Sequence, residues 1–174
     1  SELLHEVAMT LGTEGAQVAR PQARAWLARA EFIAQDIATI RAQAESAVAG
    51  ATWSPMIDRS EAMAVAKQLE MTEATAETVV NICRELVLTF GNSHQLPAML
   101  ASALSGILNA TAFVIEEQAE VALDAPAAHA RDEVFDRKRD EAIKDLRDLD
   151  ETQPLFIGGS IIRDAEKISD ILSD

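Results

Sequence analysis

The middle of the chain contains a long stretch without any charged side chain. Between Glu85 and Glu116 there is no Asp, Glu, Lys or Arg, and residues 96–115 are mostly Leu, Ala and Ile. A helix of this composition is apolar on all sides, so other helices or lipid must cover it. Polar residues such as Asn109 dilute the apolarity, and neither end has the Lys or Arg anchors of a membrane span. We therefore expect a buried helix over residues 96–119 and no stable membrane span.

The composition favours a wholly helical protein. The chain has 174 residues, 48% of them hydrophobic but only 4% aromatic, with no tyrosine. Ala, Leu and Ile supply most of the apolar mass and favour helix over sheet, and 7 Gly and 5 Pro leave few turns. The length suits one core. We predict an all-α fold, a single-domain helical bundle of five to seven helices around the central apolar helix.

Two amphipathic helices and a short N-terminal one are predicted before this central helix. The first covers residues 1–11 and is expected to end in the segment 12–15, which contains two glycines. A second helix, over residues 58–90, is predicted to begin at the capping box Asp58-Arg-Ser-Glu61. The apolar spacing leaves open whether residues 70–75 form a kink or a break in this helix. Between them, residues 21–49 carry the clearest pattern of the chain, an apolar stripe with alternating three-four spacing that predicts a face packed on neighbouring helices: Ala23, Trp26, Ala30, Ile33, Ile37, Ile40, Ala44 and Ala47.

The C-terminal part of the sequence predicts a charged helix and then a separate short one. Residues 126–150 are densely charged with a thin apolar line, as in a helix that covers a bundle or projects beyond it. Pro154 and Gly158-Gly159 are expected to break the chain. The predicted core domain is therefore residues 1–153, and residues 154–174 form a linker and a short amphipathic helix on the same domain.

The last helix carries an apolar stripe with acidic residues on both sides. The stripe consists of Ile161, Ala165, Ile168 and Leu172. Such a face can pack on its own bundle or in the groove of a partner protein. These four residues are the candidate partner-binding surface.

Charge and cysteine content exclude several classes of protein. The 15 Lys and Arg against 29 Asp and Glu give a net charge of -14, which opposes binding to nucleic acid or anionic lipid. Cys83 is the single cysteine and cannot form an intrachain disulfide. The first 15 residues lack the basic and apolar regions of a secretory signal. We expect a cytoplasmic protein.

The sequence offers no complete catalytic or metal-binding set. A di-iron bundle needs two Glu-x-x-His pairs, and only Glu2-Leu-Leu-His5 is present, because the other two histidines lack a glutamate three residues earlier. Cys83 lies among Val and Leu, where a thiol acts as a small core hydrophobe. We expect no metal and no cofactor.

Three residues mark a candidate pocket. Asn109 is an amide among large apolar residues and needs hydrogen-bond partners if it is buried, so it either fixes helix register or lines a small pocket. Glu116 directly follows the apolar helix, where one carboxylate can point inward. With Trp26 they form the candidate pocket.

Function is predicted as non-enzymatic. The leading hypothesis is a helical protein-protein interaction protein, an adaptor, regulator or assembly subunit, that self-associates as a homo-oligomer. The alternative is a small-molecule-binding or enzymatic bundle with a pocket near Trp26, Asn109 and Glu116. A third hypothesis is a bundle that inserts its central apolar helix into membranes under certain conditions.

Overall fold

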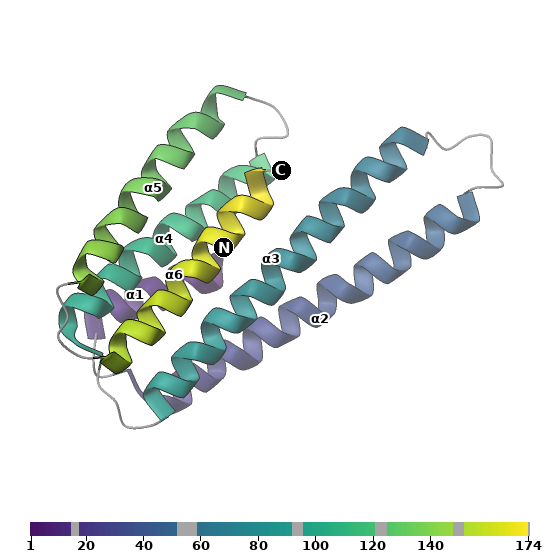
Figure 1. Cartoon of the computed structure of the whole chain (residues 1–174). Helices are drawn as coiled ribbons and strands as arrows, with labels where there is room; N and C mark the ends of the chain where they lie inside the picture. The colour runs from purple at the N-terminus through teal and green to yellow at the C-terminus, as the bar shows by residue number, and fades with distance from the viewer. Residues whose placement is uncertain (15–17, 52–58, 92–95, 121–124, 148–151, 174) are drawn as a thin grey trace.

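The protein is all-helical, as predicted. The computed structural model describes residues 1–14, 18–51, 59–91, 96–120, 125–147 and 152–173, in which six helices and no strands are present (Figure 1). The helices are α1 (Glu2–Glu14), α2 (Arg20–Ala51), α3 (Arg59–Gly91), α4 (Ala98–Glu120), α5 (Ala125–Arg147) and α6 (Thr152–Ser173). They pack as one helical bundle.

Helix α4 is the central apolar helix of this bundle, which confirms the prediction. It packs against α1, α5 and α6. Its largest fully buried side chains are Leu100, Leu104, Ile107 and Leu108. Residues Ala98–Gln118 are long and apolar enough to cross a membrane, but 56% of the most apolar segment lies buried inside the protein. A core helix that other helices surround has the same apolar composition as a membrane span, so the composition alone does not indicate a span.

Helix α1 lies on α4. It continues past Gly12 and ends at Glu14, within the segment 12–15 whose two glycines were predicted to end it. Ser105 on α4 donates a hydrogen bond from Oγ to the carbonyl oxygen of Ala8, at 2.7 Å. A Cβ atom on Gly12 would lie only 2.9 Å from this Oγ. The glycine therefore permits the close approach of the two helices.

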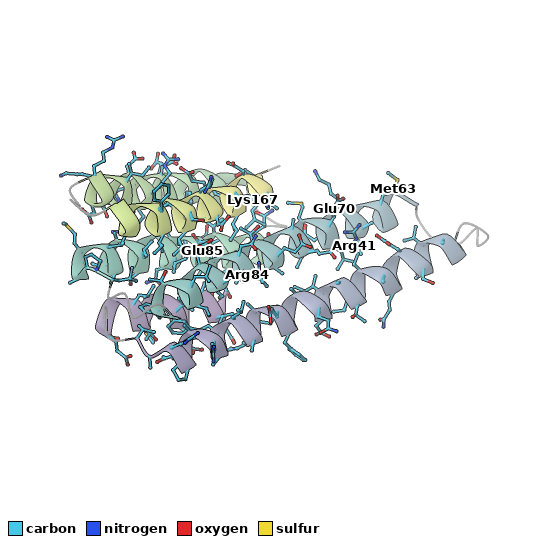
Figure 2. The ribbon with its side chains drawn as sticks, turned by 60° about the horizontal axis from the view of Figure 1, so that its bottom comes forward. Arg41, Met63, Glu70, Arg84, Glu85 and Lys167 are labelled. Atoms are coloured by element: carbon cyan, nitrogen blue, oxygen red, sulfur yellow. The ribbon has the colours of Figure 1, made fainter. Side chains whose placement is uncertain are left out.

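Helices α2 and α3 form a hairpin that is longer than the rest of the bundle. They have 32 and 33 residues, about 50 Å at a rise of about 1.5 Å per residue, whereas α4, α5 and α6 are about 35 Å long. Helix α3 is continuous through residues 70–75. The ends at Ala51 and Arg59 extend away from the other helices (Figures 1 and 2). We call residues 31–51 and 59–75 the arm, and the other described residues the body.

Helix α6 begins earlier than predicted. Residues 154–160 are helical, so the expected linker and the break at Gly158-Gly159 are wrong. Pro154 falls in the first turn, where proline is tolerated because the amide there has no intrahelical partner. The cost of two helical glycines is offset by the burial of the apolar stripe of α6 against α3 and α4.

The free cysteine lies in the core, as expected. Cys83 is fully buried on α3. Burial raises the pKa of its thiol to about 12. At neutral pH the thiol is therefore protonated and acts as a packing group.

Replacement of Gly159 tests the early start of α6. An added Cβ there meets no heavy atom within 4 Å, so Gly159→Ala should raise the free energy of unfolding by about 0.5–1 kcal/mol through helix propensity. Urea denaturation followed by circular dichroism measures this. An unchanged or lower midpoint would contradict a helical residue 159.

Candidate functional site

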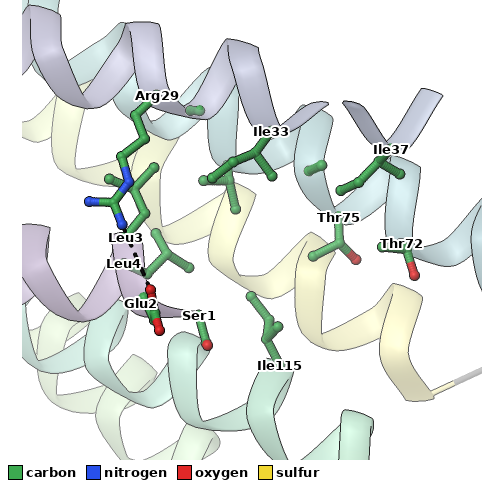
Figure 3. Close-up of a pocket in the computed structure, with 13 residues that line it drawn as sticks. Ser1, Glu2, Leu3, Leu4, Arg29, Ile33, Ile37, Thr72, Thr75 and Ile115 are labelled. Atoms are coloured by element: carbon green, nitrogen blue, oxygen red, sulfur yellow. Dashed lines mark ion pairs between the residues drawn. The ribbon is translucent and has the colours of Figure 1, made fainter. Parts of the chain in front are cut away.

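A cavity of about 420 Å³ opens where the arm leaves the body (Figure 3). Ile33 and Ile37 reach it from α2, and Ile115 reaches it from α4. Most of its wall is apolar, formed by Leu3, Leu4, Ala30, Ile33, Ile37, Ala76, Val79 and Ile115. The cavity is therefore an apolar hollow between α1, α2, α3 and α4.

The guanidinium and the two threonine hydroxyls that line this cavity already have partners. Arg29 donates from Nη1 to Glu6 Oε2 at 2.7 Å and lies 3.8 Å from Glu2. The hydroxyls of Thr72 and Thr75 donate to backbone carbonyls one turn earlier in α3, at 2.7 and 2.8 Å. Among the described residues, no buried side-chain nitrogen or oxygen lacks a hydrogen-bond partner. The cavity thus offers mainly apolar contact area, with the polar groups of Ser1 and Glu2 also among its lining residues.

The apolar wall continues along the arm as an open face. Ile33 is 38% exposed and Ile40 is 48% exposed. Ala44 lies one turn beyond Ile40, and on α3 Gln68 and Val65 lie one and two turns beyond Thr72, on the same side. We call this surface the groove face, formed by Ile33, Ile37, Ile40, Ala44, Val65, Gln68 and Thr72.

The groove face corrects the prediction made for α2. The stripe from Ala23 to Ala47 is fully buried only at its inner end, at Ala23, Trp26 and Ala30. A second series with the same spacing faces α3, because Leu27 and Ala34 pack against the core beside Ala23 and Ala30. This second series was visible in the sequence but was not used in the prediction. Because the second series faces α3, Ile33 and Ile40 beside it remain exposed to solvent.

The opposite side of the α2–α3 hairpin is charged. A shallow hollow there is lined by Glu31, Ala34, Glu77, Val80, Asn81 and Arg84. Between the two helices, Arg41 on α2 forms ion pairs with Glu45, at 2.8 Å, and with Glu73 on α3. Figure 2 shows Arg41 between the helices and Glu70 on α3. Ion pairs of Arg41 thus link the two helices of the hairpin, and other charged side chains lie on the side opposite the groove face. Asp36 is a charged residue at the edge of the groove face itself.

The predicted pocket residues meet around α1. His5 Nδ1 lies 2.7 Å from Asn109 Oδ1, and His5 Nε2 lies 3.2 Å from Glu116 Oε1. Trp26 donates from Nε1 to Glu6 Oε1 at 3.0 Å. Asn109 is exposed on α4, so the hydrogen-bond requirement of a buried amide does not apply to it. These residues fasten α1 to α2 and α4, and none of the three lines the cavity.

The C-terminal stripe is part of the core. Ile161, Ala165 and Ile168 are fully buried and Leu172 is 7% exposed, because α6 packs against α3, α4 and α5. Of the two alternatives for this stripe, the structure shows packing on its own bundle. The four residues are therefore not an open partner-binding surface in this structure.

Comparisons with known proteins add no relative to this description. No family model matches the chain, and no curated protein or solved structure matches it significantly. In the part of the chain that the structure describes, no three His, Cys, Asp or Glu side chains form a group able to hold a metal ion. Function must therefore be inferred from the geometry of the chain itself.

Replacement of Glu116 tests the contact that holds α1. The hydrogen bond from His5 lowers the pKa of the Glu116 carboxyl below its ordinary value of 4.5. A carboxylate with a lowered folded-state pKa stabilises the fold above its unfolded-state pKa and loses this effect as the pH falls through the folded-state value. Glu116→Gln should therefore lower the Tm at about pH 6, and the difference from the native chain should close as the pH falls through the lowered folded-state pKa of Glu116.

Glu117→Gln is the matched control, because it removes the same charge without the His5 contact. Thermal denaturation of all three proteins across this pH range measures the effect. A Tm difference for Glu116→Gln that is constant with pH, or equal to that of Glu117→Gln, would contradict the role given to His5.

Proposed function

We propose that this chain is a non-enzymatic helical interaction protein, an adaptor, regulator or assembly subunit, that binds its partner through the arm. The observation that carries the proposal is the groove face. It joins an apolar cavity to a run of exposed aliphatic side chains, on a hairpin that extends beyond the body. Surfaces of this kind are typical of sites where another helix docks.

The distribution of exposed apolar side chains supports this assignment. Eleven large hydrophobic side chains are exposed among the described residues, and six of them belong to the arm: Phe32, Ile33, Ile40, Val48, Met63 and Val65. Single exposed hydrophobic residues are ordinary, but a concentration on one projecting element marks an interaction surface.

The small-molecule alternative has weaker support. A specific site for a metabolite combines an apolar wall with a few polar groups that fix the orientation of the ligand. Here Arg29 is bound by Glu6, and the threonine hydroxyls are bound by their own helix. Apolar side chains of a partner helix fit this cavity better than a polar metabolite does.

The hypothesis of conditional membrane insertion is also less well supported. Helix α4 contacts α1, α5 and α6 along its length, and its release would expose the apolar faces of all three. The arm can bind a partner without any such opening of the body. This simpler route favours the interaction hypothesis.

Site-specific photo-crosslinking tests the proposal. A benzophenone amino acid replaces Ile40 on the groove face, or Leu88 on the body as a control, since Ile40 is 48% and Leu88 is 54% exposed. In cells that express the chain, light should produce protein crosslinks at position 40 and far fewer at position 88. Equal crosslinking at the two positions, or none at position 40, would contradict binding through the arm.

A further inference from the structure

We infer that the groove face binds a second copy of this chain, and that the two arms pack side by side, antiparallel, into a four-helix bundle. This inference rests on the proposed function and names the partner. A two-fold dimer requires a surface that is complementary to itself. The surface area of the chain and the charge of the groove face support this partner.

The surface area of the chain matches that of a subunit. A compact monomer of 18.8 kDa has an accessible surface of about 8,300 Å². This chain exposes 10259 Å², an excess of about 2,000 Å² over that expectation. A specific interface of standard size buries only about 800 Å² per partner. The excess of the whole chain is therefore larger than the area that one partner buries in a standard interface.

The charge of the groove face favours an identical partner over a charged one. None of its seven residues carries a charge, although the chain has a net charge of -14. A basic partner would find its acidic counterparts on the opposite side of the α2–α3 hairpin, at Glu31 and Glu77. An uncharged aliphatic surface is best matched by another uncharged aliphatic surface, and the second copy presents one of the same length.

The charge of the body determines the relative direction of the two arms. The arm contains three cationic and six anionic side chains, a net charge of -3, so the rest of the chain carries -11 of the -14. Parallel arms would bring the two bodies together, where these charges repel. Antiparallel arms hold the bodies apart. Paired around Ile37 and Ile40, they place Ala44 of each arm beside Ile33 of the other, at the cavity.

Analytical ultracentrifugation of the purified chain over a wide concentration range, at low and high NaCl, tests the inference. We expect a monomer–dimer equilibrium that becomes tighter with NaCl, because salt screens the repulsion between two acidic chains. Ile40→Glu should raise the dissociation constant at least about tenfold, since it buries an unpaired charge. Leu88→Glu should dimerise like the native chain, and both variants should keep native circular dichroism.

The outcomes separate this inference from the proposed function. A chain that stays monomeric at all concentrations, while position 40 still crosslinks to another protein in cells, would overturn the second copy and leave the interaction function standing. A dimer that Leu88→Glu disrupts and Ile40→Glu does not would also overturn the inference. Dimers that dissociate as salt increases would contradict the uncharged interface.

A spin label on Ala47→Cys tests the direction of the arms, since Cys83 is buried and does not compete for the label. Antiparallel arms paired around Ile37 and Ile40 place the two labelled backbones about 25 Å apart, from a rise of about 1.5 Å per residue. Parallel arms place them about 10 Å apart, the spacing of neighbouring helices. Double electron–electron resonance distinguishes the two, and the shorter distance would overturn the antiparallel arrangement.

Discussion

The length of α2 and α3 relative to the other helices is the constraint on which the rest of the structure depends. Two helices of 32 and 33 residues pack on each other over their whole length, but the helices that cover them are about a third shorter. The outer half of the hairpin therefore has one neighbour instead of several. Apolar side chains that would be core residues in a longer bundle, above all Ile33 and Ile40, remain open to water. Arg41, paired with Glu45 and Glu73, helps to fasten the hairpin where the body no longer supports it.

The main features of the fold could be predicted from the sequence, because they depend on composition and on single-helix patterns. A helix without charged residues, such as most of α4, can lie only in a protein core or in a membrane. The stripe from Ile161 to Leu172 lies on one face of α6, and that face packs on the rest of the bundle. The glycines at 158 and 159 could not be interpreted locally, since burial of the rest of α6 overrides their low helix propensity. On α2, two apolar series with the same spacing overlap. Periodicity shows which residues share a face but not which neighbour covers it.

The candidate site was predicted less well than the fold, because it arises from contacts between distant residues. Asn109 and Glu116 were identified as unusual, but their shared partner His5 lies more than a hundred positions earlier. Likewise Trp26 and Arg29 both bind Glu6 on α1. These contacts complete the hydrogen bonding of the polar side chains around α1. What remains open is an apolar surface, and such a surface recognises shape and apolar area in its partner more than hydrogen-bonding groups.

The central claim is that, beyond its base, where Ala34 and Met71 still pack against the core, the arm of a single chain is held only by the contact between α2 and α3. Amide hydrogen exchange, followed by mass spectrometry over a range of protein concentrations, tests this claim most directly, because exchange reports the local free energy of opening. At low concentration the amides of residues 31–51 and 59–75 should exchange much faster than those of α4, and they should become protected as the concentration rises. Arm amides that exchange as slowly as those of α4 at every concentration would contradict the account.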